Sequence, residues 1–153
     1  MQVTRYTDYA IRVLIYLAVN KDQKSTIHQI AESYSISKNH LMKIVQTLNS
    51  EGFLLATRGK NGGLKLNSNP NEINLGKLVR NLESHSNLVE CFGDNNHCVI
   101  TPSCQLKSIL GQAVESFYKT LDQFTLADLV TPRSQTELSQ LLNISSIDNS
   151  QTN

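Results

Sequence analysis

Two short amphipathic helices followed at once by a glycine-rich hairpin are the feature that most restricts how this chain can fold. The stretch from Thr26 to Gln29 has the form of a capping box and predicts a helix that ends near Ser33. Ser37 is a good N-cap for a second helix through Leu48, whose apolar residues repeat at helical spacing. A tight turn between two such helices is typical of a helix-turn-helix.

The hairpin is predicted directly after Gly52, which ends the second helix. Residues 53–58 and 64–66 flank a turn that contains Asn-Gly-Gly, and glycine adopts the positive φ of a tight turn at low cost. A hairpin in this place is a wing, so we expect a winged helix-turn-helix with a two-stranded wing. Its basic residues beside a glycine-rich tip would suit a minor groove.

The polar residues at the start of the second helix predict contact with double-stranded operator DNA. A recognition helix enters the major groove by its N-terminal end, so the side chains of its first two turns reach base edges. Asparagine can pair with adenine and lysine with guanine, or either can hold phosphate. The predicted DNA-binding residues are Ser37, Lys38, Asn39, His40 and Lys43 on the helix, and Arg58 and Lys60 on the wing.

The distribution of charge supports a polyanionic partner for the first half of the chain. Residues 1–80 contain 11 Lys and Arg against five Asp and Glu, whereas the remaining residues contain three against eight. The net charge of +1 therefore hides a basic half joined to an acidic half. Charge alone would equally describe a solvated surface, so the prediction of DNA binding depends on the helices and the hairpin.

The rest of the chain predicts a mostly α-helical protein. Thr4 to Asn20 repeats apolar residues at helical spacing, and Asn74 caps a further helix. A long helix is expected to open with Thr101 as N-cap and Pro102 in its first turn, and its apolar stripe continues to Phe124. Because the first 80 residues already hold a closed set of elements, we expect this long helix to pair two copies of the chain in a homodimer.

These patterns divide the chain into four parts. We expect a winged-helix DNA-binding domain over residues 1–83, a cysteine-bearing loop over residues 84–104 and a dimerisation helix region over residues 105–132. From residue 133 to residue 153 the composition turns to Ser, Gln, Asn and Thr, which predicts a mobile tail.

The chain has only three cysteines, Cys91, Cys98 and Cys104, and they lie within 14 residues. An odd number argues against a disulfide framework, whereas three thiolates and one further ligand suit zinc or an iron–sulfur cluster. The gaps of six and five residues are wider than the spacing usual for structural zinc, so the loop can wrap an object larger than one ion. Cys104 would lie in the first turn of the long helix, where the dipole favours thiolate. His85 or His97 could complete the site.

Other classes of protein have little support in the sequence. There is no Ser/His/Asp order, phosphate-binding loop or pair of carboxylates that would indicate an enzyme. A metal-dependent or thiol enzyme whose basic half holds a phosphorylated substrate is the alternative of a different class. No apolar run approaches the ~20 residues of a membrane-spanning helix, and the first residues do not resemble a signal peptide. We therefore expect a cytoplasmic protein with no membrane partner.

Several of these segments together resemble one family. They are Tyr6-Thr7-Asp8-Tyr9-Ala10, Ser37-Lys38-Asn39-His40-Leu41, Arg58-Gly59-Lys60-Asn61-Gly62-Gly63, and the three cysteines with Ile100-Thr101-Pro102 between the last two. They resemble the winged-helix iron–sulfur transcription repressors of the IscR and NsrR type, and the NsrR branch most closely. The resemblance runs from Met1 to about Val130.

The resemblance implies a homodimeric repressor that releases its operator when nitric oxide attacks a bound 2Fe–2S or 4Fe–4S cluster. It also implies that Cys91, Cys98 and Cys104 ligate the cluster. In the NsrR branch the fourth ligand would be the acid of the first helix, here Asp8 reaching across from the other protomer, whereas the IscR branch uses a histidine. The alternative is a winged-helix regulator whose cysteines bind zinc, sense thiol oxidation or report the supply of clusters.

Overall fold

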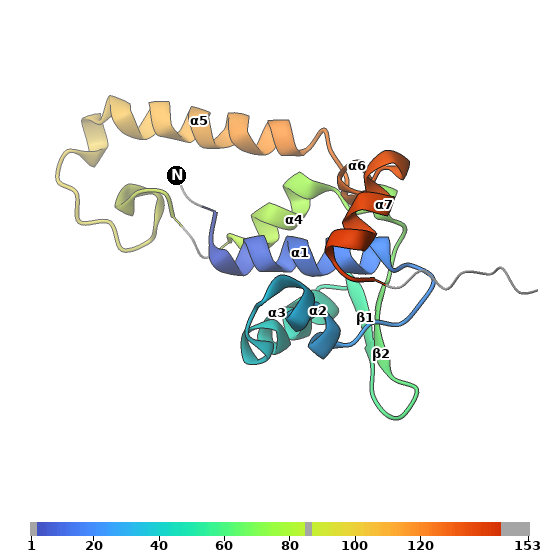
Figure 1. Ribbon diagram of the computed structural model, residues 1–153. Coiled ribbons are helices and arrows are strands. Elements are labelled where there is room, and N and C mark those ends of the chain that lie inside the picture. Colours follow the sequence, from blue (N-terminus) through green and yellow to red (C-terminus); the bar gives the residue numbers. More distant parts are fainter. Residues whose placement is uncertain (1–2, 85–86, 145–153) are drawn as a thin grey trace, which may run out of the picture.

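The computed structural model describes residues 3–84 and 87–144, which form a mostly helical fold with one two-stranded antiparallel sheet (Figure 1). The elements are α1 (Arg5–Val19), α2 (Ile27–Tyr34), α3 (Lys38–Ser50), β1 (Leu54–Thr57), β2 (Gly63–Leu66), α4 (Leu75–Leu82), α5 (Gln105–Leu121), α6 (Leu126–Leu129) and α7 (Pro132–Leu141). The predicted mostly α fold with a winged helix-turn-helix is confirmed. No helix within the described ranges is long and apolar enough to cross a membrane.

Helix α1 lies at the centre of the fold, with α3, α4, α6, α7 and the wing packed around it. Its N-cap Thr4 accepts a hydrogen bond from the backbone of Thr7, and both Thr4 donors bond Glu83 at the end of α4, at 2.8–2.9 Å. Its buried face is almost wholly apolar and includes Leu14, which is completely enclosed. Each fully buried aliphatic side chain contributes about 1.5–3 kcal/mol, so this face contributes substantially to the stability of the fold.

The helix-turn-helix forms as its caps predict, with one exception. Thr26 and Gln29 make the reciprocal bonds of a capping box at the start of α2. Ser35 ends α2 in the left-handed conformation, at φ 53°, and this sharp turn allows α3 to begin three residues later. Ser37 occupies the N-cap position of α3 as predicted, but its side chain makes no capping hydrogen bond.

The wing is a short hairpin that is fixed to the helix-turn-helix at two points. Leu54 pairs with Leu66 and Thr57 with Gly63, so the register places Leu64 in the core. Leu64 also exchanges two backbone bonds with Ser25, at 3.0 and 2.7 Å. On the other strand, the Ala56 amide donates to Asn49 Oδ1 of α3 at 2.9 Å. These bonds hold the wing and α3 in one orientation.

A close approach joins α4 to the end of α5. Gly76 of α4 lies so near Asp122 that a side chain at this position would overlap it. The Asp122 carboxylate accepts two bonds from the Arg80 guanidinium, at 2.5 and 2.8 Å, and Arg80 stacks on Tyr118 at 4.7 Å. These hydrogen bonds lower the pKa of Asp122 and raise the pKa of Arg80. The C-terminal end of α5 is therefore anchored.

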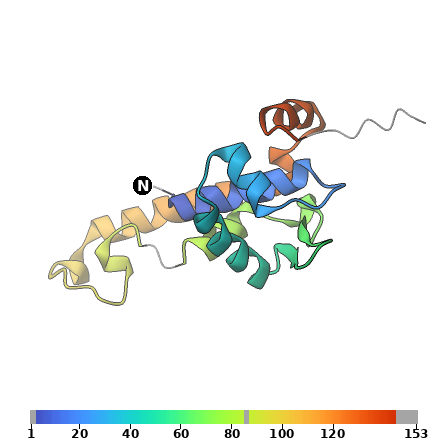
Figure 2. The same ribbon diagram turned by 60° about the horizontal axis from the view of Figure 1, so that its bottom comes forward.

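The remainder of α5 leaves the body of the protein, which both ribbon views show (Figures 1 and 2). None of its residues is buried, and its apolar face includes Leu106 and Ile109, which are 58% and 60% exposed. The helix begins later than predicted, because Thr101 belongs to a separate 3-10 turn and Cys104 takes the N-cap position. It also ends before Phe124. The homodimer through this face stays a prediction.

The predicted tail differs from the structure in its first part. Residues 132–141 form α7, and the following residue, Leu142, is only 5% exposed and joins the core. The helix begins because Thr131 and Ser134 make reciprocal capping bonds, a signal that a polar composition conceals. Ser33 of α2 donates to the Leu142 carbonyl oxygen at 2.7 Å and ties this segment to the helix-turn-helix. Residues 145–153 of the predicted tail lie outside the described residues.

Candidate functional site

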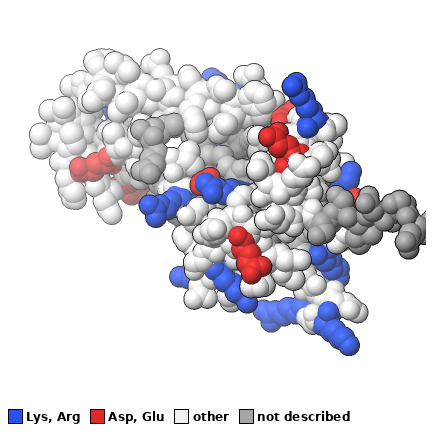
Figure 3. Space-filling model, viewed as in Figure 1, with Lys and Arg blue, Asp and Glu red and all other residues white. Residues whose placement is uncertain are grey.

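A hollow of about 1050 Å³ lies between α3 and the wing. We call it the α3–wing surface. Four of the predicted DNA-binding residues line it, namely Lys38, Asn39, Lys43 and Arg58. Lys and Arg side chains gather on this lower face of the molecule, over α3 and the wing (Figure 3). The arrangement offers hydrogen-bonding groups and positive charge on one concave face.

The other three predicted residues have different positions. Lys60 lies exposed at the tip of the wing, and Ser37 lies exposed just before α3, outside the hollow. His40 is half-buried, and its ring packs edge-on against Tyr9 of α1 with the ring centres 5.3 Å apart. The structure therefore uses His40 to join α3 to α1 and not to line the α3–wing surface.

Four further residues of α3 line this surface, namely the buried Val45 and the exposed Met42, Gln46 and Asn49. Asn49 also accepts the bond that positions the wing. The signal that finds the three exposed residues is helical spacing, since residues three, four, seven and ten positions after Asn39 lie on the same side of a helix. Gln46 and Asn49 lie beyond the first two turns of α3, and Met42 lies within them but is apolar.

Lys60→Ala is expected to weaken binding to every DNA sequence by a similar factor, because a lysine at the exposed wing tip would meet phosphate and not a base. The slope of log affinity against log salt should become shallower by about one, since the variant neutralises one phosphate fewer. Asn39→Ala should instead reduce the preference for the operator over other sequences, because asparagine can read adenine. Affinities measured over a range of salt concentrations separate the two effects.

Lys119→Ala is the matched control for the wing, because this lysine is exposed in the last turn of α5 and does not line the α3–wing surface. Its affinity and salt slope should equal those of the wild type. An unchanged slope for Lys60→Ala would remove the wing from the interface.

Asp8, the predicted fourth ligand, lies in the first turn of α1 and is already paired. Arg12 donates to both of its carboxylate oxygens, at 2.7 and 3.1 Å. The Arg12 guanidinium also lies over the rings of Tyr9, at 5.5 Å, and Tyr34, at 5.9 Å. Since Tyr9 packs against His40, a chain of contacts runs from Asp8 to α3. Any other partner of Asp8 must share it with Arg12 or displace Arg12.

The three cysteines lie on the segment before α5, at the end of the molecule where α1 begins (Figure 1). All three thiols are free; Cys98 is exposed, and Cys91 and Cys104 are half-buried. The segment is folded on itself, since the Thr101 hydroxyl donates to the Cys98 carbonyl at 2.8 Å and the His97 amide donates to Glu90 at 2.6 Å. Hydrogen bonds within the segment thus stabilise its conformation.

An iron–sulfur cluster fits this segment in the kind of donor that it offers, because three free thiols follow one another in 14 residues. In the single chain, however, these three thiols do not lie together. Within residues 3–84 and 87–144, no three His, Cys, Asp or Glu side chains lie close enough together to hold a metal ion. His85, the other candidate ligand, lies outside the described residues. Binding a cluster would require the loop to rearrange.

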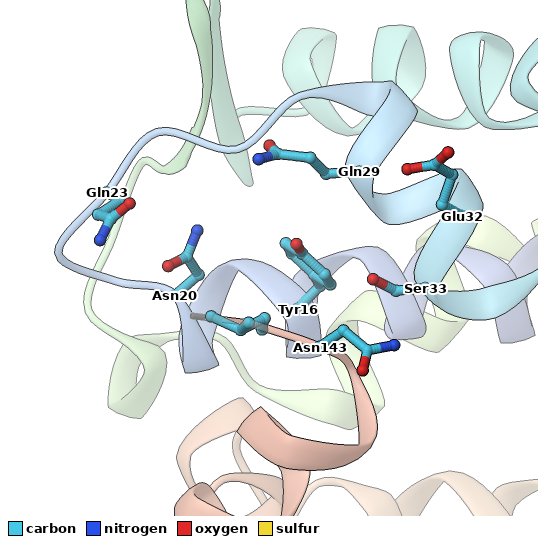
Figure 4. Close-up of a pocket in the computed structure, with 8 residues that line it drawn as sticks. Tyr16, Asn20, Gln23, Gln29, Glu32, Ser33 and Asn143 are labelled. Atoms are coloured by element: carbon cyan, nitrogen blue, oxygen red, sulfur yellow. The ribbon is translucent and has the colours of Figure 1, made fainter. Parts of the chain in front are cut away.

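A second hollow, of about 260 Å³, lies between α1, α2 and the segment after α7 (Figure 4). Burial raises the pKa of Tyr16 at its floor, so the phenol stays protonated. Two of the other polar side chains around it already have partners within the protein. Asn20 donates to Ser25 at 2.9 Å, and Ser33 donates to the Leu142 carbonyl. This hollow is open to solvent on one side and is lined by groups that bond within the chain itself, and we assign it no ligand.

Known transcription regulators match both the sequence and the fold. The family profile described as "Rrf2: Iron-dependent Transcriptional regulator" matches residues 3–132. The chain belongs to the Rrf2 family. Its Rrf2 relatives include the HTH-type transcriptional regulators NsrR of Bacillus licheniformis and Bacillus subtilis. The first is 48% identical over 132 residues, which cover 85% of this chain and 92% of the relative. The second is 49% identical over 132 residues, which cover 85% and 90%.

The fold of this Rrf2 chain is similar to the solved structure of T. potens IscR, with a TM-score of 0.71. The two are 22% identical over 90% of this chain and 91% of that chain. The resemblance to the NsrR branch is thus confirmed by sequence, and the winged fold by structure. Because its relatives are named as transcription regulators, the chain is a transcription regulator, and the prediction that it is not an enzyme is confirmed.

Proposed function

We propose that this Rrf2 protein is a cytoplasmic repressor that binds operator DNA as a homodimer and releases it when nitric oxide attacks an iron–sulfur cluster. The observation that carries the DNA-binding part is the α3–wing surface, where four predicted contact residues from two elements share one concave face. Two recognition helices about 34 Å apart would occupy successive major grooves of one operator.

The proposed dimer is supported by α5. Its apolar face is exposed along a helix that projects from the body, and burying such a face is the usual reason for two chains to associate. A two-fold axis through α5 would use the same face of both copies. The acidic second half of the chain then stays away from DNA, and the two basic halves face it.

The proposed cluster ligands are Cys91, Cys98, Cys104 and the partner's Asp8. Bound there, the cluster would supply iron that reacts with nitric oxide. An oxygen ligand would hold iron less firmly than a thiolate, so Asp8 would be the ligand most easily displaced by a small gas. The contacts of Asp8 support a link to DNA, because Arg12 and Tyr9 connect this carboxylate to His40 on the recognition helix.

The test uses full-length protein purified without oxygen and a duplex selected by that protein from a random-sequence library. Visible absorbance reports the cluster, and operator affinity is measured before and after nitric oxide. We expect a brown protein whose affinity falls about tenfold or more on treatment, since breaking one base contact costs about 1–3 kcal/mol. Cys98→Ser should give a colourless protein whose affinity does not respond to nitric oxide.

Ser103→Ala is the control for this variant, because Ser103 is an exposed neighbour of Cys104 that carries no thiol. It should keep both the colour and the response. Equal affinities for the untreated, treated and cluster-free wild type would reject the nitric-oxide switch and leave the DNA-binding proposal intact. A colourless protein that contains zinc would favour the alternative, a winged-helix regulator with a zinc or thiol sensor.

A further inference from the structure

Met42 is an exposed apolar side chain on the part of α3 that faces the wing. Half of its surface, 50%, is accessible to solvent. The buried side of α3 is formed by Leu41, Ile44, Val45 and Leu48. Met42 is therefore not a core residue, and it lines the α3–wing surface. Single exposed apolar side chains are ordinary on proteins, so the position of this residue carries the argument.

The neighbours of Met42 on this face of α3 are polar. Asn39 precedes it by three residues, Lys43 follows it, and Gln46 lies one turn further on. Helical spacing puts Asn39, Met42 and Gln46 on one side of the helix. Among the residues of α3, all of which the structure describes, Met42 is the one large apolar side chain that is exposed. The apolar side chain of Met42 is thus surrounded by polar side chains that can bind base edges and phosphates.

The major groove of DNA presents one apolar group, the C5-methyl of thymine. Apart from small ring C–H groups, the other groups on its floor are hydrogen-bond donors or acceptors, which a thioether side chain cannot satisfy well. We propose that Met42 contacts the methyl group of a thymine in each half of the operator and so contributes to sequence preference. This inference rests on the proposed binding of DNA by α3. An unbranched, flexible side chain is suited to cover a methyl group whose position varies slightly between sites.

Deoxyuridine provides the test, because it removes the thymine methyl and keeps every hydrogen-bonding group of the base. The full-length protein first selects a duplex from a random-sequence library, and each thymine is then replaced singly by deoxyuridine. The affinity of the wild type is expected to fall about fourfold at one position of each half-site, as burial of one methyl group predicts. Met42→Ala should bind the thymine and deoxyuridine duplexes equally well.

Leu55→Ala is the matched control, because Leu55 on β1 is exposed to a similar extent, 53%, and does not line the α3–wing surface. It should keep the sensitivity to deoxyuridine. Circular dichroism verifies that both variants are folded.

The outcomes separate this inference from the proposal beneath it. If the wild type selects no duplex, DNA binding by this chain fails, and the inference fails with it. If the wild type binds but no single deoxyuridine lowers the affinity, DNA binding stands and the methyl contact is wrong. The methyl contact is also wrong if Met42→Ala keeps the wild-type sensitivity to deoxyuridine. It is wrong as well if Met42→Ala weakens binding to both duplexes by the same factor, so that the difference in affinity between them remains.

Discussion

Replacing Leu14 with alanine is expected to lower the free energy of unfolding by about 3–4 kcal/mol, a large part of what a domain of this size has. Leu14 is fully enclosed at the middle of α1, the helix that the other elements surround. The substitution removes buried apolar atoms and leaves a cavity that rigid helices on several sides cannot fill. Urea unfolding, followed by circular dichroism at one protein concentration, measures the decrease.

The control for this prediction is Leu141→Ala on α7. The chemistry of the change is the same, but Leu141 is 68% exposed, so the decrease should stay below about 0.5 kcal/mol. A similar decrease for the two variants would show that α1 is not the centre of the core.

Replacing Gly76 with alanine is the second large expected effect, a decrease of about 1–3 kcal/mol in the free energy of unfolding. The new Cβ would overlap a carboxylate oxygen of Asp122 and lie 2.9 Å from its backbone nitrogen. The carboxylate has to move, and its two bonds to Arg80 break. Alanine is ordinarily the better helix former, so a decrease in stability here would measure the close approach of α4 to α5.

Gly111→Ala serves as the opposite control for this change. Gly111 lies inside α5, and a Cβ there meets nothing within 4 Å of the same chain. Since alanine replaces glycine in an open helical position, stability should rise by about 0.5–1 kcal/mol. Opposite signs for the two variants are the expected result. A gain in stability for Gly76→Ala would contradict the packing of α4 against Asp122.

Much of the fold could be predicted because its signals are local. The capping box at Thr26, the cap at Asn74 and the glycine-rich turn of the hairpin are each satisfied by residues a few positions away. The predicted start of α5 was wrong because Thr101 bonds within its own loop and Ser103 ends a separate turn. The docking of α7 was hidden for a different reason, since Leu142 meets the core and its carbonyl meets Ser33 only in the folded protein.

The site was predictable to the extent that helical spacing defines a face. Lys38, Asn39 and Lys43 line the α3–wing surface as their positions suggest. His40 does not, because the partner that turns it inward, Tyr9, is 31 residues earlier in the chain. The pairing of Asp8 with Arg12 follows helical spacing, but the two aromatic rings that enclose Arg12 come together only in the folded protein.

The docking of α7 has a practical consequence for anyone who shortens this protein. Ending the chain at Thr131 looks like a harmless trim of a polar extension. It would take away Leu142 and the carbonyl that Ser33 bonds, and it would remove the side of the hollow beside Tyr16 that Asn143 and Ile144 form. A truncated version made for crystals or spectroscopy would thus have a loosened α2 next to the reading helix. Its DNA affinity should not be used as the reference for the intact regulator.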